Sequence, residues 1–522
     1  MKLHLTSVDL VMLIVYAIGI FILAQVVSRN KSGEAKTSTD YFLASRSLPW
    51  WAIGASLIAA NISAEQIVGM SGSGYAIGLA ISSYEWMAAI SLLLVGKLFL
   101  PIFLKNKIYT MPQFLEYRYG KRIRTLMAIF WLGLYVFVNL TSIIWLGSIA
   151  VSQIGGIDQG LALVLLGAFA LLYQLWGGLK AVALTDIVQV TLLVTGGLVI
   201  SVLTLDKIGA GAGMVAGFHT LLARAPEHFH MILGRDNPFY KDLPGISVLI
   251  GGMWVMNISY WGFNQYIIQR ALAAKSLREA QRGIVFAAFL KILMPFIIVL
   301  PGITAVILAP GLQRPDQAYA SVMSLLPPGL LGLVFAALVA AIVASTASKI
   351  NSIATIFTLD VWNARGKVHT DRQLVTVGRI AAVTAIVIAI LTAKPLLGSF
   401  DQAFQFIQEY TGFFTPGIVV IFILGLFWSR ATEAGALVAA SGSFIMSLAL
   451  KLFMPSLPFM DRVGLVFVIA LVLAVVVSLA KPAADDVNRI DTKGVDYSTT
   501  PGFAFGSVCV VAIVAALYTI WW

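Results

Sequence analysis

Long apolar stretches separated by short polar loops recur from one end of the chain to the other. Each is close to the length of about 20 residues that a helix needs to cross the core of a bilayer. About fourteen can be distinguished, with approximate ranges 7–28, 50–76, 80–104, 125–152, 160–177, 183–205, 245–268, 283–309, 329–358, 377–395, 403–427, 433–453, 462–480 and 502–521. The pattern predicts an all-α integral membrane protein of about fourteen transmembrane helices, with the lipid bilayer as solvent.

The composition supports this class and removes the main alternatives. Of 522 residues, 59% are hydrophobic and 11% are charged, and the mean hydropathy is +0.91. A soluble domain carries about a quarter charged residues, so this chain has too little charge to cover a globular surface. The net charge of +11 would suit a nucleic-acid-binding protein if it formed one patch. It is spread over loops, so no nucleic-acid partner is predicted.

The distribution of Lys and Arg predicts the orientation of the chain. Cytoplasmic loops are rich in Lys and Arg, and here the loops after odd-numbered spans hold most of them. They are Arg29, Lys31, Lys36, Arg46, Lys105, Lys107, Arg118, Lys121, Arg122, Arg124, Arg270, Lys275, Arg278, Arg282, Arg365, Lys367, Arg372, Arg430, Lys481, Arg489 and Lys493. Both termini are therefore expected outside. The short loops, and the lack of an N-glycosylation triplet in an exposed outer loop, favour a bacterial inner membrane.

Two spans carry polar residues near the middle of the membrane. The second reads SLIAANISAEQIVGMSGSG and the seventh reads WVMNISYWGFNQ, five spans apart. Interrupted helices at matching positions of two halves are a pointer to a transport site, although polar side chains can also simply hold helices together. The expected plan is an extra helix and loop (1–49), a five-helix repeat (50–205), an outer loop (206–244), a second, inverted five-helix repeat (245–428) and three accessory helices (429–522).

Four ionisable residues lie within apolar spans, where a charge is costly and is by default a functional candidate. They are Glu65, Glu85, Lys291 and Lys349. Glu85 and Lys291 are opposite in sign and are expected to neutralise one site together. For Lys349, snorkelling of the long side chain toward the cytoplasmic interface is an adequate interpretation.

Motifs that could indicate nucleotide binding, metal binding or catalysis give little support to those functions. Gly69, Gly72 and Gly74 lie in a spanning segment without a preceding strand, which argues against a phosphate-binding loop. His228 and His230 lie in the longest outer loop, where surface histidines are the simpler interpretation. The only cysteine is Cys509, so no internal disulfide can form. No hydrolase, zinc-protease or nucleotide-binding motif is found, and an enzyme is not predicted.

Several stretches together resemble the sodium:solute symporter family. They are SLPWWAIGASLIAANISAEQIVGMSGSGYAIGLA, GGLKAVALTDIVQV, WGFNQYIIQRALAAKS and FQFIQEYTG, and the similarity extends from TDYFLA, which begins at Thr39, to the last helix. The resemblance implies a symporter with a five-plus-five inverted-repeat core, broken helices and outward-facing termini. It agrees with the orientation indicated by the loop charges.

The resemblance also implies a sugar site between two gates. Its sugar-binding residues would be Asn61, Gln66, Glu85, Asn257, Tyr260, Lys291 and Gln408. Tyr260 would be the inner gate, and Met70, Tyr84 and Phe404 would close the outer side, although helix packing also explains such aromatic residues. Ala88 stands where the family relative has a serine, which leaves the sugar preference open.

The sodium site implied by the resemblance consists of the carbonyls of Ala59, Ile62 and Ala341 with a hydroxyl at Ser345. Hard cations prefer such oxygen ligands. Ala344 occupies a position at which a second serine is expected. Asp186 resembles an aspartate on the route of sodium to the cytoplasm, and a helix cap is the competing interpretation.

These observations predict sodium-coupled inward symport of a neutral hexose, galactose or glucose, by alternating access. One alternative is a sodium symporter for another solute, such as sialic acid, proline, pantothenate or iodide. A site with one carboxylate, one ammonium and four amides suits a neutral polyol better than a carboxylate ligand. Another alternative is a sugar sensor or a passive channel on the same scaffold. The sequence leaves stoichiometry and oligomeric state open.

Overall fold

The computed structural model describes residues 5–28, 49–108, 110–176, 179–362, 370–400, 402–481 and 489–522. Within α11 (Leu179–Ile208) it describes the side chains only from Val188 onward. The predicted ion-exit residue Asp186 therefore lies outside the described side chains. The same is true of several predicted cytoplasmic charges and of the TDYFLA stretch, which fall in 29–48 and 363–369.

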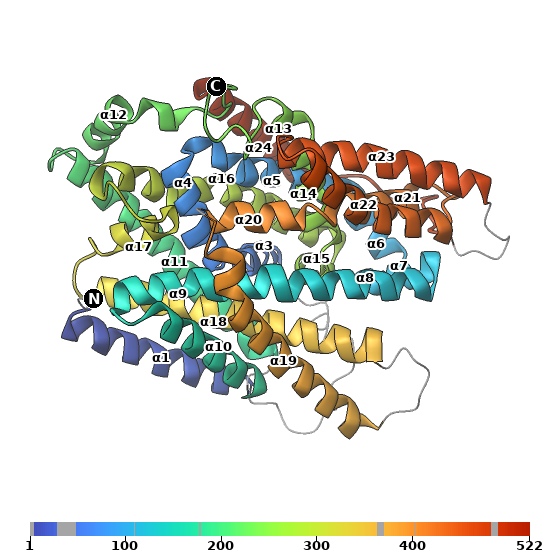
Figure 1. Ribbon diagram of the computed structural model, residues 1–522, viewed down its shortest axis with the longest axis horizontal. Coiled ribbons are helices and arrows are strands. Elements are labelled where there is room, and N and C mark those ends of the chain that lie inside the picture. Colours follow the sequence, from blue (N-terminus) through green and yellow to red (C-terminus); the bar gives the residue numbers. More distant parts are fainter. Residues whose placement is uncertain are drawn as a thin grey trace.

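The described residues form helices and connecting turns, and most long helices run along the long axis of the molecule (Figure 1). The other α-helices are α1 (Ser7–Ser28), α3 (Trp50–Asn61), α4 (Ser71–Ala76), α5 (Ser83–Leu94), α6 (Leu100–Lys105), α7 (Met111–Tyr119), α8 (Lys121–Gly133), α9 (Thr141–Gly155), α10 (Gln159–Trp176), α12 (Met214–Arg224), α13 (Ser247–Ile250), α14 (Gly252–Ile258), α15 (Gln265–Leu272), α16 (Leu277–Leu308), α17 (Ala318–Met323), α18 (Leu330–Ile356), α19 (Asp371–Leu397), α20 (Ala403–Thr411), α21 (Thr415–Phe427), α22 (Glu433–Phe453), α23 (Phe459–Ala480) and α24 (Pro501–Ile520). Wider π-helical turns form η2 (Glu65–Met70), η4 (Val95–Phe99), η5 (Leu134–Leu140), η7 (Ser259–Phe263) and η9 (Phe357–Trp362), and 3₁₀ turns form η3 (Leu79–Ser82), η6 (Pro226–Phe229) and η8 (Pro315–Gln317).

The prediction of an all-helical, many-span membrane protein is confirmed. In the described ranges, 9 helices are long and apolar enough to cross a membrane, and the number rises to 11 when each of two bent helix pairs is taken as one span. Two shorter apolar helices cover Ser7–Gly19 and Gln159–Tyr173. The predicted span 245–268 consists of the short elements α13, α14, η7 and the first part of α15. The total of fourteen remains a prediction.

Apolar side chains cover the outside of the helix bundle. Ile380 and Leu391 on α19, Val472 on α23 and Val508 on α24 are all exposed. Such a surface is unfavourable in water and favourable in lipid, because the bilayer core is as apolar as these side chains. The exposed faces therefore agree with the composition.

The second span is broken where its polar residues cluster, as predicted. The segment Trp50–Asn61 meets Glu65–Ala76 at 67°, because Ile62 leaves the helical conformation (φ −72°, ψ 116°). The seventh span breaks at Asn264 (φ −83°, ψ 115°), whose side chain accepts a hydrogen bond from the Tyr266 amide. Both breaks lie next to the polar residues that predicted them.

A further break was not predicted. The helices α20 and α21 meet at 43° inside the predicted span 403–427. Gly412 and Pro416 flank the bend, and both residue types weaken a continuous helix. They are the sequence signal that could have indicated the break.

Small residues let the broken span approach its partner α16 closely. A methyl group added to Gly283 of α16 would lie 2.8 Å from the Cβ of Ile53, and one added to Gly54 would lie 2.8 Å from the Gly283 carbonyl. Contacts this short are possible only without side chains, as is common where membrane helices pack. The close approach places the C-terminal end of α3 beside the middle of α16.

Both chain ends contact segments at the predicted outer side of the membrane. Asp9 of α1 accepts hydrogen bonds from the amides of Gly329 (2.7 Å) and Gly332 (2.8 Å), at the start of α18. The Met231 amide donates to the carbonyl of Trp521 at 2.7 Å. Both ends accordingly lie in the left half of the view (Figure 1).

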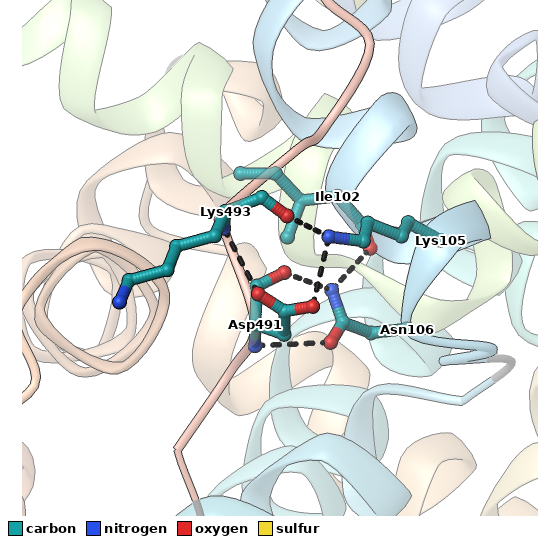
Figure 2. Close-up of polar contacts among 5 residues, drawn as sticks. All are labelled: Ile102, Lys105, Asn106, Asp491 and Lys493. Atoms are coloured by element: carbon teal, nitrogen blue, oxygen red, sulfur yellow. Dashed lines mark hydrogen bonds and ion pairs between the residues drawn. The ribbon is translucent and has the colours of Figure 1, made fainter.

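Toward the other end of the molecule, the segment before α24 is fastened to the end of α6 (Figure 2). Lys105 forms an ion pair with Asp491 at 2.8 Å and also donates to the Lys493 carbonyl. Asn106 donates to the Asp491 carbonyl (3.0 Å) and accepts from the Asp491 amide (3.1 Å). We call residues 489–500 the C-terminal strap. The Lys105 side chain beside it holds the pKa of Asp491 below its usual value.

Candidate functional site

The ten residues predicted for the sugar site and its gates surround one cavity. The cavity volume is about 70 Å³, below the range of about 300–1,000 Å³ typical of small-ligand sites. Its lining comprises Asn61, Gln66, Met70, Tyr84, Glu85, Ala88, Met256, Asn257, Tyr260, Trp261, Lys291, Phe404, Gln408 and Thr411. These residues come from the end of α3 and from η2, α5, α14, η7, α16 and α20. Segments far apart in the sequence therefore meet at the helix break.

A buried ion pair lies at the centre of the cavity wall. The Lys291 ammonium is 2.5 Å from a Glu85 carboxylate oxygen, and the two side chains are 1% and 3% exposed. Lys291 also donates a hydrogen bond to the Asn61 side-chain oxygen. Burying an isolated charge is very unfavourable, whereas a closely paired and hydrogen-bonded one can be tolerated. The pair presents polar atoms to the cavity without net charge.

Other polar atoms in the wall are left for a ligand. The side-chain oxygen of Gln66 and the hydroxyl of Tyr84 are buried and find no hydrogen-bond partner among the described residues. Leaving such groups unpaired costs about 1–3 kcal/mol each. A ligand with several hydroxyl groups, each able to donate and accept, would satisfy them. A net-neutral wall and unpaired acceptors together suit an uncharged polyol.

Aromatic side chains enclose the cavity on two sides. Tyr84 and Phe404 meet edge to face with ring centroids 5.1 Å apart, and Phe404 and Met70 are fully buried. Asp316 of η8 accepts a hydrogen bond from the Ala403 amide at 3.1 Å, which fixes the start of the helix that carries Phe404. The contact between Tyr84 and Phe404 closes one side of the cavity.

Tyr260 stands on another part of the wall. Its hydroxyl accepts a hydrogen bond from the Asn61 amide at 3.1 Å, and its side chain is half-buried. The hydrogen bond joins the break of the second span to the break of the seventh. Movement of either helix would therefore shift the ring.

Part of the cavity wall was not predicted from the sequence. Trp261 lies beside the charged pair, with the Lys291 ammonium 5.0 Å from its ring centroid, a distance at which cations and aromatic faces attract. Met256 and Thr411 also contribute. Trp261 and Met256 stand in the stretch WVMNISYWGF that was already singled out, so their position beside Asn257 and Tyr260 was the available signal.

A second, smaller pocket lies at the same helix break. Its volume is about 10 Å³, and it brings together all four predicted sodium-site residues. The full lining is Ala59, Ile62, Gln189, Val190, Tyr266, Ala341, Ala344 and Ser345. The last carbonyls of an interrupted helix lack the next turn as a partner, and Ser345 adds a hydroxyl oxygen. An uncharged wall that can offer such oxygens suits a small hard cation.

Lys349 does not extend toward a helix end as predicted. Its ammonium lies 4.6 Å from the ring centroid of Tyr135 and 4.9 Å from that of Tyr266, and it donates to the Asn139 side chain at 3.4 Å. Attraction to two aromatic faces and an amide oxygen keeps it inside the protein. The snorkelling interpretation was therefore wrong.

Known proteins share much of this sequence. The sequence model of the sodium:solute symporter family matches residues 41–442. The chain is 48% identical over 542 aligned positions to the sodium/glucose cotransporter of Vibrio parahaemolyticus, covering 99% of both proteins. It is 34% identical to human sodium/myo-inositol cotransporter 2, over 82% of this chain and 67% of that protein.

A solved structure shares the fold. A Na⁺-coupled sialic acid symporter, described in a substrate-bound outward-open state, superposes with a TM-score of 0.76 and covers 92% of this chain and 99% of its own. Its sequence identity of 24% makes the likeness one of fold alone. The family match spans most of the sequence, and the relatives are transporters, not enzymes. The chain belongs to the sodium:solute symporter family.

Proposed function

We propose that this protein carries sodium and a small neutral sugar across the membrane together, by alternating access. The observation that carries the proposal is the pairing of two sites at one helix break. One is a cavity with a neutral Glu85–Lys291 pair and unpaired hydrogen-bonding groups, and the other is a small uncharged pocket. The name of the full-length Vibrio relative, a sodium/glucose cotransporter, supports the same conclusion.

The substrate is a hexose, with galactose or glucose as the first choices. Asn61, Gln66, Asn257 and Gln408 offer amides to its hydroxyls, and the Glu85–Lys291 pair offers a charged acceptor and donor of zero net charge. A carboxylate substrate would require a net positive site, which this cavity lacks. Ala88 contributes a methyl group, so discrimination between epimers depends on the remaining side chains.

Alternating access follows from the two aromatic barriers. Met70, Tyr84 and Phe404 form the outer gate, and Tyr260 forms the inner gate. Only one opens at a time, so the sugar and sodium cross together. About fourteen helices, arranged as two inverted repeats of five with four accessory helices, carry these gates. The basic loops face the cytoplasm and both termini lie outside a bacterial inner membrane.

Coupling to sodium supplies the driving force. A membrane potential of 100 mV contributes about 2.3 kcal/mol per charge, and a tenfold sodium gradient contributes about 1.4 kcal/mol. One sodium ion per sugar therefore supports accumulation of roughly several-hundred-fold. The carbonyls of Ala59, Ile62 and Ala341 with the hydroxyl of Ser345 hold the ion, and Asp186 lies on its exit route.

Uptake into proteoliposomes tests the proposal. We expect labelled galactose or glucose to accumulate under an inward sodium gradient and to equilibrate without accumulation when choline replaces sodium. A panel with myo-inositol, sialic acid, proline and pantothenate identifies the substrate class. Sodium-independent equilibration of sugar would indicate a channel, and sugar binding without any flux would indicate a sensor.

A further inference from the structure

A second Glu–Lys pair lies beside the sodium pocket and has no part in the function proposed above. Glu65 begins η2 and Lys349 lies on α18. An electrostatic attraction acts between them, but in the described part of the chain no ion pair within 4.0 Å joins their charged atoms. One carboxylate oxygen of Glu65 is buried and lacks a hydrogen-bond partner among the described residues. The two charges are therefore not neutralised by direct contact, unlike those of Glu85 and Lys291.

The Lys349 ammonium occupies a site built to recognise a cation. Two tyrosine faces, those of Tyr135 and Tyr266, and the side-chain oxygen of Asn139 surround it. Aromatic faces and amide oxygens attract cations in general, and the Glu65 carboxylate adds negative potential. The cation held there is tethered to the protein by the lysine side chain.

A single side chain, that of Tyr266, separates the Lys349 ammonium from the sodium pocket. Tyr266 lines the pocket while its ring faces the Lys349 ammonium. Ser345, which also lines the pocket, is four positions before Lys349 on α18, and such neighbours are about 5–6 Å apart at Cβ. Glu65 follows the pocket residue Ile62 by three positions. Unit charges at such distances interact appreciably even with partial screening.

One more cation faces this cluster. The Arg270 guanidinium lies 4.7 Å from the Tyr266 ring centroid, donates to the Ser56 hydroxyl at 3.0 Å and repels Lys349. Glu65 therefore lies in a region that already holds two fixed positive charges. A sodium ion in the pocket would be a third.

We propose that Lys349 is a tethered cation that competes with sodium for the negative potential of Glu65 and so sets the sodium affinity of the neighbouring pocket. The inference rests on the proposed sodium-coupled function. With the pair intact, the opposite charges largely cancel at the pocket, and sodium binds loosely enough to be released in each transport cycle. Removing either charge alone changes the affinity, in opposite directions.

The test measures sodium binding directly, apart from transport. The melting temperature of the purified protein is followed against sodium concentration, with choline chloride keeping the ionic strength constant, because an ion that binds only the folded state stabilises it by mass action. We expect Lys349→Met to lower the sodium concentration at half-maximal stabilisation about tenfold. Glu65→Gln should raise it about tenfold. The double variant and Lys349→Arg should lie near the wild type.

Lys97→Met is the matched control, because Lys97 donates to the Tyr497 carbonyl in the C-terminal strap and should not affect the midpoint. If Lys349→Met does not fold, Lys349→Gln carries the same prediction. Shifts of both single variants in one direction, or no shift in either, would overturn the inference while the wild-type sodium response leaves the proposed function standing. A wild type without any sodium response in stabilisation or uptake would overturn both.

Discussion

The two pockets at the helix break are built from opposite kinds of chemistry. The larger cavity is made by side chains, with the buried Glu85–Lys291 pair and amides pointing into it. The smaller pocket is lined mostly by small and apolar residues, such as Ala59 and Ala341, and its polar side chains are Gln189, Tyr266 and Ser345. A sugar needs many directed hydrogen bonds, whereas a small cation needs a shell of oxygens in place of water. The same break in the second span serves both needs.

Two Glu–Lys pairs make the contrast sharper. Glu85 and Lys291 touch and cancel each other's charge inside the cavity. Glu65 and Lys349 make no such contact among the described residues, and the Lys349 ammonium faces the rings of Tyr135 and Tyr266 beside the smaller pocket. Direct contact yields a neutral polar surface for a neutral ligand, and separation preserves a field that a cation can sense. The spacing of a charge pair, and not its composition, decides which ligand it suits.

The largest effect should come from breaking the direct pair. Glu85→Gln leaves the Lys291 ammonium buried without its partner, which destabilises the fold by about 3–5 kcal/mol and abolishes concentrative uptake. Adding Lys291→Met should restore most of the stability but not the uptake, because the cavity then lacks its charged donor and acceptor. Thermal melting and sugar uptake of the three proteins separate these effects.

Asp491→Asn provides the control for that comparison. It removes one charge of the exposed pair with Lys105, and exposed pairs contribute little, so both melting and uptake should stay near wild type. Wild-type uptake by Glu85→Gln would remove Glu85 from the sugar site. Replacing Gln66 with Ala should likewise abolish accumulation while the protein remains folded.

The sodium affinity of the smaller pocket should depend on single hydroxyl groups. Ser345→Ala removes the only hydroxyl ligand predicted there and should raise the half-maximal sodium concentration for uptake about tenfold or more, since a bond to a charged partner contributes about 1.5–3 kcal/mol. Ala344→Ser, on the adjacent position, should lower that concentration. Packing disturbance alone would not shift the two in opposite directions. An unchanged sodium curve for Ser345→Ala would place the ion elsewhere.

A pH effect should arise from a buried carboxyl group in the loop before α13. Burial raises the pKa of Asp242, in the loop before α13, to about 6, and the nearby Glu409 carboxylate adds to the rise. A carboxyl group with a raised folded-state pKa opposes folding while ionised. Stability should therefore rise as the pH falls from about 7 through 6, with the gain complete near the ordinary value of 3.8.

Asp242→Asn should remove this contribution. The difference in stability between variant and wild type is expected to be about 1–2 kcal/mol larger at pH 7 than at pH 4.5, after allowance for partial exposure of the carboxylate. Melting curves of both proteins at the two pH values measure it. Parallel pH profiles would show that Asp242 is ionised equally in the folded and unfolded states.

The smallest effect should come from the Tyr260 hydroxyl. Tyr260→Phe removes the hydrogen bond from Asn61, worth about 0.5–1.5 kcal/mol, and should retain much of the uptake because the ring still closes the cavity. Tyr260→Ala removes the ring and should lose most uptake. Equal rates for the two variants would show that the ring is no gate.

The sequence by itself determined the class of protein and much of the larger cavity. Runs of about 20 apolar residues can be stable only in lipid, so the helical membrane fold was predictable. Asn61, Glu85 and Lys291 stood out because polar groups in such runs are costly and are retained for a purpose. The smaller pocket could be predicted only through the family resemblance, since Ala59 and Ala341 carry no chemical signal in their side chains.

Only the tertiary structure decided which charges meet. Glu85 and Lys291 are 206 positions apart, and their contact depends on the packing of α5 against α16, where the Trp86 indole also donates to the Ile292 carbonyl at 3.2 Å. Lys349 was predicted to snorkel because a sequence shows the helix that carries a lysine but not the tyrosines that surround it. The bend between α20 and α21 was likewise missed. Helix periodicity is a local property, whereas the distance between two charges is set by how distant helices pack.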